Sequence, residues 1–108
     1  MDTINIDYLK KLKIKVGTVE QCEAVKGSEK LLKLLVNFGS ESRTILSGIA
    51  KNYSPESLIG KQLPFILNLE PREMMGETSN GMLLAVNNMG EPVLLVPDKS
   101  TENGSDVI

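Results

Sequence analysis

The sequence predicts an all-β domain, a small barrel of about five short strands with short helical turns and a C-terminal extension. Apolar residues alternate with polar ones in several short segments, as they do in half-buried strands. Turn signals that contain glycine separate these segments. The chain has 108 residues, of which 41% are hydrophobic, and this suffices for one modest core. We therefore treat residues 1–108 as a single domain.

A short helix is expected close to the N-terminus. Asn5 and Asp7 are both suitable N-cap residues, and Ile6 and Leu9 follow at helical spacing. We expect one or two helical turns over residues 7–11.

The first strand is expected where the hydrophobic period changes to two. This change occurs over residues 12–19, and strand character continues to residue 25. Apolar residues alternate there with lysines, so the exposed face of the strand would carry a row of positive charge. The alternating positions are Leu12, Ile14 and Val16 on one face and Lys11, Lys13 and Lys15 on the other.

Further short strands follow along the chain. They are expected at residues 31–38, 43–47, 62–69 and 82–86, with one more at 93–96. Phe38 and Phe65 lie in these segments at positions that favour the core. Residues 71–81 form a polar loop in this interpretation, and residues 87–90 form a turn.

A second helical turn separates the third strand from the fourth. Ser54 is placed as its N-cap, Pro55 occupies the first helical position, and Gly60 follows residues 55–58 where a glycine commonly ends a helix. This strand count and helix position fit a five-stranded OB-fold barrel. From about residue 97 the tail is expected to be extended rather than packed.

The composition argues against several kinds of chemistry. The chain has no histidine and one cysteine, Cys22, so a zinc site and a disulfide framework are both excluded. We find no nucleophile–base pair, no glycine-rich phosphate loop and no metal cluster. We therefore expect no catalytic residues, no metal and no cofactor, and interpret Cys22 as a small packing residue.

No apolar run approaches the roughly 20 residues of a membrane span. The N-terminal residues also lack the basic-then-apolar pattern of a signal peptide. These two observations predict a cytoplasmic protein without a membrane partner.

Charge is distributed unevenly along the chain. The formal net charge is −2, which taken alone disfavours a nucleic-acid partner. Residues 1–51, however, hold nine basic and six acidic side chains, whereas residues 52–108 hold three and eight. Because counterion release depends on the cations that meet phosphates, one basic face is enough to bind a polyanion.

Several ordered motifs resemble one known family. They are RTILSGIAK at 43–51, SPESLIGK at 54–61, NLEPR at 68–72, SNGMLLA at 79–85 and VPDK at 96–99, supported by INIDY at 4–8 and KLLKL at 30–34. Together they resemble the tRNA-binding OB-fold domain that stands at the C-terminus of many methionyl-tRNA synthetases and also occurs as a free bacterial tRNA-binding protein. The resemblance covers roughly residues 4–108.

The resemblance implies binding of tRNA by its folded shape, without a chemical step. It also implies a homodimer in which the segment after the barrel contributes to the interface, and association with the catalytic part of methionyl-tRNA synthetase. Four positions depart from the family pattern: Gly27-Ser28 replaces a common His-Pro pair, Glu73 replaces a second basic residue, and Asn80 replaces a common Glu.

The matched motifs supply the candidate tRNA-binding residues. Lysine and arginine bind phosphates, while serine and asparagine offer polar groups to a 2′-hydroxyl or a base edge. Each also has a structural alternative, such as a solvated lysine, an ion pair from arginine to Glu41 or Glu20, or a methionine in the core. The candidates are Lys30, Lys33, Arg43, Ser47, Asn68, Arg72, Ser79 and Met82.

A second function of another class shares this fold and size. A small bacterial chaperone linked to protein export binds unfolded polypeptide, and such a role favours a dimer with an exposed apolar groove. The motifs above resemble the synthetase branch more closely.

Overall fold

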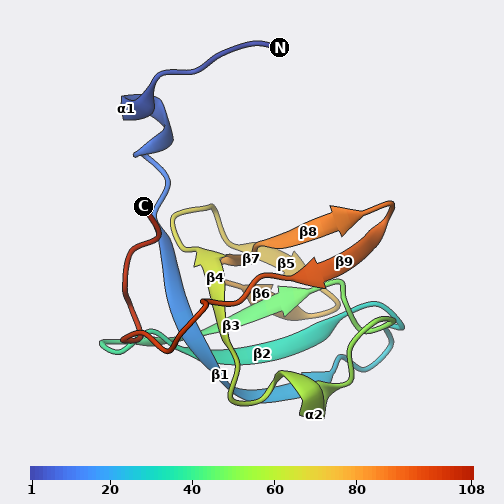
Figure 1. Cartoon of the computed structure of the whole chain (residues 1–108). Helices are drawn as coiled ribbons and strands as arrows, with labels where there is room; N and C mark the ends of the chain where they lie inside the picture. Colours follow the sequence, from blue (N-terminus) through green and yellow to red (C-terminus); the bar gives the residue numbers. More distant parts are fainter.

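Nine strands and two one-turn helices make up the computed structural model, which describes residues 1–108 (Figure 1). In chain order they are α1 (Ile6–Leu9), β1 (Ile14–Ala24), β2 (Leu32–Asn37), β3 (Ser42–Ser47), α2 (Pro55–Leu58), β4 (Gln62–Ile66), β5 (Arg72–Met74), β6 (Glu77–Ser79), β7 (Met82–Leu83), β8 (Ala85–Asn88) and β9 (Glu91–Leu94).

Five of these strands form one curled antiparallel sheet in the order β3-β2-β1-β4-β7. The last strand returns to the first, because β3 lies against both β7 and β6. The backbone N–H of Asn80 donates to the carbonyl of Thr44 at 2.9 Å across this junction. The sheet thus curls into a barrel, and the predicted OB-like fold is confirmed.

Strand β1 bends so that its two halves pair with different strands. Residues 14–18 pair with β4, whereas residues 18–24 pair with β2, with a register shift between Val19 and Gln21. Gly17 lies at the bend, and a Cβ atom there would come within 2.6 Å of Val36 and 2.7 Å of Phe38. The sheet can curl this tightly only because residue 17 has no side chain.

The core fills the barrel with aliphatic side chains around one aromatic pair. Phe38 and Phe65 are buried, as predicted, and their rings meet edge to face with centroids 5.5 Å apart. Alternate residues of β2 point into this core, which the sequence pattern also predicted. The core members are Val19, Leu32, Leu34, Val36, Phe38, Ile45, Ile49, Leu58, Leu63, Phe65, Leu67 and Leu83.

Both helices lie close to their predicted positions. Helix α1 begins at Ile6, slightly before the predicted span of 7–11, because the Asn5 side chain caps it by accepting from the Tyr8 N–H at 2.8 Å. Helix α2 occupies the predicted residues 55–58. Ser54 is its N-cap residue but makes no side-chain capping bond.

The prediction of a polar loop at 71–81 was wrong. Arg72–Met74 and Glu77–Ser79 pair as the antiparallel hairpin β5–β6, which packs outside the barrel against β3. Its two-residue turn places Met75 and Gly76 at φ values of +53° and +79°, which suits the twist of a tight hairpin.

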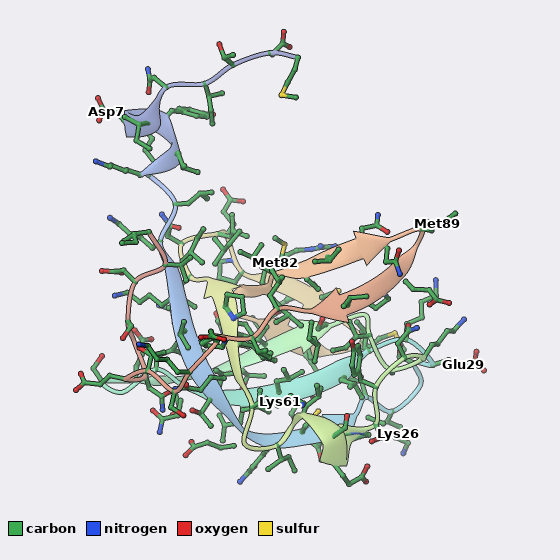
Figure 2. All side chains as sticks on the ribbon, viewed as in Figure 1. Asp7, Lys26, Glu29, Lys61, Met82 and Met89 are labelled. Carbon is green, nitrogen blue, oxygen red and sulfur yellow. The ribbon has the colours of Figure 1, made fainter.

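The chain after β7 forms a second small hairpin. The strand predicted at 82–86 is divided into β7 and β8, and the strand predicted at 93–96 begins earlier, as β9. Met89 and Gly90 form the turn with φ values of +53° and +91°. The β8–β9 hairpin projects from the barrel, and Met89 lies at its tip (Figures 1 and 2).

The sequence predicted a C-terminal tail that is extended rather than packed. The tail contains no helix or long strand, but it packs against β1 because its backbone bonds to an open edge of that strand. The N–H of Val16 donates to the carbonyl of Ser105 at 2.9 Å, and the N–H of Gly104 donates to the carbonyl of Val16 at 2.7 Å. The tail uses the edge of β1 that β2 leaves unpaired. Asn103 adds side-chain bonds to Thr18 and Gln62.

Candidate nucleic-acid interface

Six of the eight candidates lie on β2, β3, the β5–β6 hairpin and β7, where β3 faces β7 and the hairpin; we call this region the motif wall, and its candidates are Lys33, Arg43, Ser47, Arg72, Ser79 and Met82. Lys30 precedes β2 and Asn68 follows β4, so neither lies on these strands. Arg72 pairs with Ser79 across the hairpin, and Ser79 bonds to β3. Lys33 pairs with Leu46 of β3 and forms an ion pair with Glu77 of the hairpin. The motifs that are far apart in the sequence therefore lie side by side.

Arg43 joins two segments of this wall. Its Nη1 donates to the backbone carbonyl of Leu67 at 2.7 Å and to that of Asn80 at 3.3 Å. Its Nε donates to a carboxylate oxygen of Glu41 at 2.7 Å, which is the ion pair that the sequence offered as an alternative. This guanidinium lowers the pKa of the Glu41 carboxyl below its usual value, chiefly through that hydrogen bond.

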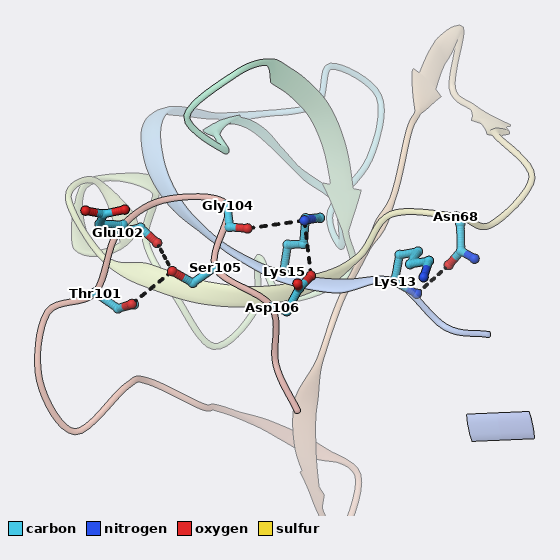
Figure 3. A network of polar contacts seen from close by, with 8 residues as sticks. All are labelled: Lys13, Lys15, Asn68, Thr101, Glu102, Gly104, Ser105 and Asp106. Carbon is cyan, nitrogen blue, oxygen red and sulfur yellow. Dashed lines mark hydrogen bonds and ion pairs between the residues drawn. The ribbon is translucent and has the colours of Figure 1, made fainter. Parts of the chain in front are cut away.

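Asn68 holds the segment that leads into β1. Its Oδ1 accepts from the N–H of Lys13 at 2.8 Å (Figure 3). Its Nδ2 donates to the carbonyl of Lys11 at 2.7 Å. Both ends of the amide are thus engaged within the protein. A direct bond to RNA by this side chain stays a prediction, and the structure gives it a positioning role as well.

Ser79 is the one buried polar residue of the barrel, with 4% of its surface exposed. Its hydroxyl accepts from the N–H of Leu46 at 2.9 Å and donates to the carbonyl of Gly81 at 3.0 Å. Contact between this hydroxyl and RNA also stays a prediction, because both hydrogen bonds of the hydroxyl are made to backbone groups within the protein.

Lys33 lies between two carboxylates. Its Nζ is 3.2 Å from an oxygen of Glu77 and 3.4 Å from an oxygen of Glu23. The hydrogen bonds to Glu77 and then Glu23 raise the pKa of the ammonium, so Lys33 is cationic throughout the neutral range. Any phosphate that binds Lys33 competes with these two glutamates.

The remaining candidates present surface to solvent. Lys30 and Arg72 are exposed and form no ion pair, and Ser47 is half-buried at the end of β3. Met82 is 44% exposed, so it does not take the core position that its strand would allow. Figure 2 shows Met82 beside the base of the β8–β9 hairpin.

The wall combines cationic side chains, polar side chains that bond to the backbone, and an exposed methionine. Such groups are suited to bind a nucleic-acid backbone and an unstacked base. The family model described as "Putative tRNA binding domain" matches residues 14–106, which contain the whole barrel. This chain belongs to the tRNA-binding domain family.

Relatives of this tRNA-binding domain are parts of larger enzymes. The chain is 45% identical over 107 residues to the methionine–tRNA ligase of Caldanaerobacter subterraneus subsp. tengcongensis, covering 99% of this chain and 17% of the relative. It is 48% identical over 104 residues to the methionine–tRNA ligase of Methanothrix thermoacetophila, covering 96% of this chain and 15% of the relative. The chain thus spans about a sixth of the length of these relatives.

Two solved structures share the whole fold of the tRNA-binding domain. A MetRS-related protein from Pyrococcus horikoshii superposes with a TM-score of 0.96 at 38% identity, covering 100% of both chains. The chaperone CsaA from Bacillus anthracis superposes with a TM-score of 0.90 at 28% identity, covering 99% of this chain and 100% of the other.

The structure also shows two lysine contacts that the sequence did not indicate. Lys15, one of the lysines predicted on an exposed face, is half-buried; its Nζ lies 3.1 Å from Asp106 and donates to the carbonyl of Gly104 (Figure 3). Glu77 was not a candidate, yet it contacts Lys33 on the wall. Neither partner could be found from local sequence, since each pair is separated by more than 40 residues.

Three further observations concern the rest of the domain. No group of three or more Cys, Asp or Glu side chains is placed to hold a metal ion. Neither helix has the length and apolar character needed to cross a membrane. Cys22 packs against the core, and burial, followed by the charges of Glu56 and Glu23, raises the pKa of its thiol to about 11.

Proposed function

We propose that the motif wall binds folded tRNA and that the domain acts with, or as an appended part of, methionyl-tRNA synthetase. The match of residues 14–106 to the tRNA-binding domain family is the observation that carries this proposal. The high identity to methionine–tRNA ligases, together with the small share of each ligase that is covered, supports an auxiliary role.

Direct contacts are proposed for the side chains that solvent can reach. The guanidinium of Arg72 and the ammonium of Lys30 are exposed and unpaired, so each can meet a phosphate without first breaking an ion pair. Lys33 and Ser47 lie on the neighbouring strands β2 and β3. Met82 offers an apolar surface on which an unstacked base can pack.

The proposed recognition depends on shape rather than on sequence. Base edges in A-form RNA are hard for a protein to read, so proteins bind phosphates, 2′-hydroxyls and the few unstacked bases. Asn68, whose amide could pair with one base edge, is engaged with Lys11 and Lys13, and the exposed guanidinium of Arg72 is proposed to meet a phosphate. We therefore propose binding to many tRNAs.

The proposed benefit to a synthetase is a higher local concentration of tRNA. A binding module attached to a catalytic domain makes the second contact intramolecular, and this raises the overall affinity without a new catalytic residue. We propose no chemical step for this domain itself. A cytoplasmic location, where such a synthetase works, stays a prediction.

We further propose that the domain forms a homodimer through α1 and the end of the tail. Helix α1 stands apart from the barrel (Figure 1). It carries exposed apolar side chains and buries none of its residues. An apolar cavity of about 450 Å³ lies between it and the C-terminus, lined in part by Ile6, Leu9, Leu12, Ile14, Val107 and Ile108. A second copy would cover this surface and double the RNA contacts.

The chaperone function is a second candidate because of one observation. CsaA structures from Bacillus anthracis and Picrophilus torridus both superpose with a TM-score of 0.90. Their identity to this chain, 28% and 25%, is lower than the 45% of the ligase relative named above. We therefore favour tRNA as the partner.

Equilibrium binding at several salt concentrations tests the proposal. Fluorescently labelled bulk tRNA and a reduced, unfolded polypeptide are titrated with the domain at about 50 and about 200 mM salt. We expect tRNA binding that weakens steeply with salt, as release of counterions requires. Binding of the polypeptide with no salt-dependent binding of tRNA would replace the proposal by the chaperone function.

A further inference from the structure

The hydrogen bonds of Arg43 leave few donors for a ligand. A guanidinium has five N–H donors, one on Nε and two on each Nη. Nε is bonded to Glu41, and Nη1 is shared between the carbonyls of Leu67 and Asn80, so only Nη2 has no partner. The side chain is only 27% exposed.

This arrangement is incompatible with the usual arginine–phosphate contact. A bidentate contact uses two parallel N–H groups from neighbouring nitrogens, which must include Nη2 and either Nη1 or Nε. At Arg43 both of those neighbours are engaged within the protein. A phosphate could bind in this way only after Arg43 released Glu41 or a carbonyl.

The carbonyls that Arg43 holds belong to the two segments that carry the proposed contacts. Leu67 directly precedes Asn68 and the chain to Arg72, and Asn80 precedes Gly81 and Met82. Ser79 holds the second segment from its other side, through Leu46 and Gly81. Gly81 has a φ of +150°, a conformation that glycine adopts readily and that residues with a side chain rarely adopt.

We infer that Arg43 is a positioning residue of the tRNA interface: it braces the Leu67 and Asn80 segments and so places Met82, whose proposed contact with a base is uncharged, without binding a phosphate itself. This inference rests on the proposed function. Arg43 thus acts on affinity through the geometry of the wall. A lysine at this position keeps the charge and has three N–H donors, but they share one nitrogen and cannot reproduce the planar fork that reaches Glu41 and the two carbonyls from separate nitrogens.

The salt dependence of binding separates positioning from phosphate contact. We expect Arg43→Lys and Arg43→Ala both to weaken tRNA binding about three- to ten-fold, as the loss of one or two hydrogen bonds implies. The slope of log K against log salt stays unchanged in both. Arg72→Ala is the comparison, and it lowers the slope by about 0.7–0.9, the value for one phosphate contact.

The methyl signals of the methionines report the geometry without RNA. In ¹³C-methyl-methionine protein, Arg43→Lys is expected to shift the Met82 signal and to leave the Met89 signal, at the tip of the distant hairpin, in place. Tyr53→Phe is the stability control, because it removes the bond from the Leu94 N–H to the Tyr53 hydroxyl. This variant unfolds at a lower temperature but binds tRNA normally.

Three results would overturn the inference. Arg43→Lys could bind tRNA as well as the wild type, Arg43→Ala could lower the salt slope as Arg72→Ala does, or the Met82 signal could stay unmoved. If the wild-type domain shows no salt-dependent tRNA binding, the proposed function fails, and the inference about Arg43 fails with it.

Discussion

Lys33 and Glu77 form an ion pair, with 3.2 Å between Nζ and Oε2, that ties strand β2 to the β5–β6 hairpin. Glu23 of β1 contacts the same ammonium at 3.4 Å. Because the lysine side chain is 33% exposed, these pairs contribute little to stability. Their larger effect is on binding, since they set two carboxylates against any phosphate that approaches Lys33.

Glu77→Gln is therefore expected to strengthen tRNA binding. In this variant Lys33 no longer has to break its ion pair with Glu77 before it binds a phosphate. An exposed ion pair contributes up to about 1 kcal/mol, so we expect a two- to five-fold lower Kd for tRNA. Glu73→Gln is the matched control, because it removes an equal charge from the same hairpin but breaks no ion pair. If both variants gain the same tRNA affinity, the negative charge of the hairpin alone opposes RNA binding, and competition between Glu77 and a phosphate for Lys33 is rejected.

Asn68→Ala is expected to destabilise the fold as well as to weaken binding. The variant loses bonds to the Lys13 N–H and the Lys11 carbonyl, which should lower the free energy of unfolding by about 1 kcal/mol at this exposed site. Urea unfolding measures the change. Asn88→Ala, on the exposed β8 strand and without a side-chain bond, is the control and should unfold as the wild type does.

The sequence predicted the barrel strands because their burial leaves an alternating pattern. In β2 the buried Leu32, Leu34 and Val36 alternate with half-buried neighbours, and this period is visible without a structure. The β5–β6 hairpin has no such pattern, since its residues are mostly polar and lie outside the core. Its turn depends on positive φ at Met75, a residue type that gives no turn signal.

The sequence also selected the segments of the candidate site, but it did not indicate which partners each side chain has in the fold. Resemblance to the family selected Arg43, Asn68 and Ser79, and the structure brings their segments together. Their hydrogen-bond partners lie 24 to 57 residues away, apart from Glu41 and Gly81. Local sequence cannot distinguish a side chain that contacts a ligand from one that braces the contact surface.

Gly17→Ala is expected to be strongly destabilising. The added methyl group would lie 2.6 Å from Val36 and 2.7 Å from Phe38, so the β1 bend or the core must shift, at a cost of about 1–3 kcal/mol or more. Thermal unfolding measures the loss. Gly48→Ala is the matched control, since no atom lies within 4 Å of its added methyl group. Similar stability in the two variants would show that the curl of β1 does not depend on residue 17.

Leu9→Glu tests the proposed homodimer. Leu9 is 46% exposed in the single chain and lines the cavity beside α1, so a charge there should leave the barrel folded but prevent burial against a second copy. Sedimentation is expected to show a dimer for the wild type and a monomer for the variant. Met89→Glu changes a side chain that is 98% exposed at the far hairpin and should remain dimeric. A wild-type monomer at high concentration would contradict the proposed interface.

Cys22 is expected to react slowly with alkylating agents. Burial and the charges of Glu56 and Glu23 raise the pKa of its thiol from the ordinary value of 9.0 to about 11, so at pH 8 the thiolate is about a hundred-fold scarcer than in an unperturbed cysteine. Mass spectrometry of iodoacetamide labelling should show a rate that keeps rising up to about pH 11. Glu56→Gln removes the larger of the two charge effects and should shift the profile to lower pH. A rate that levels off near pH 9 in the folded wild type would mean that neither burial nor these glutamates protect the thiol.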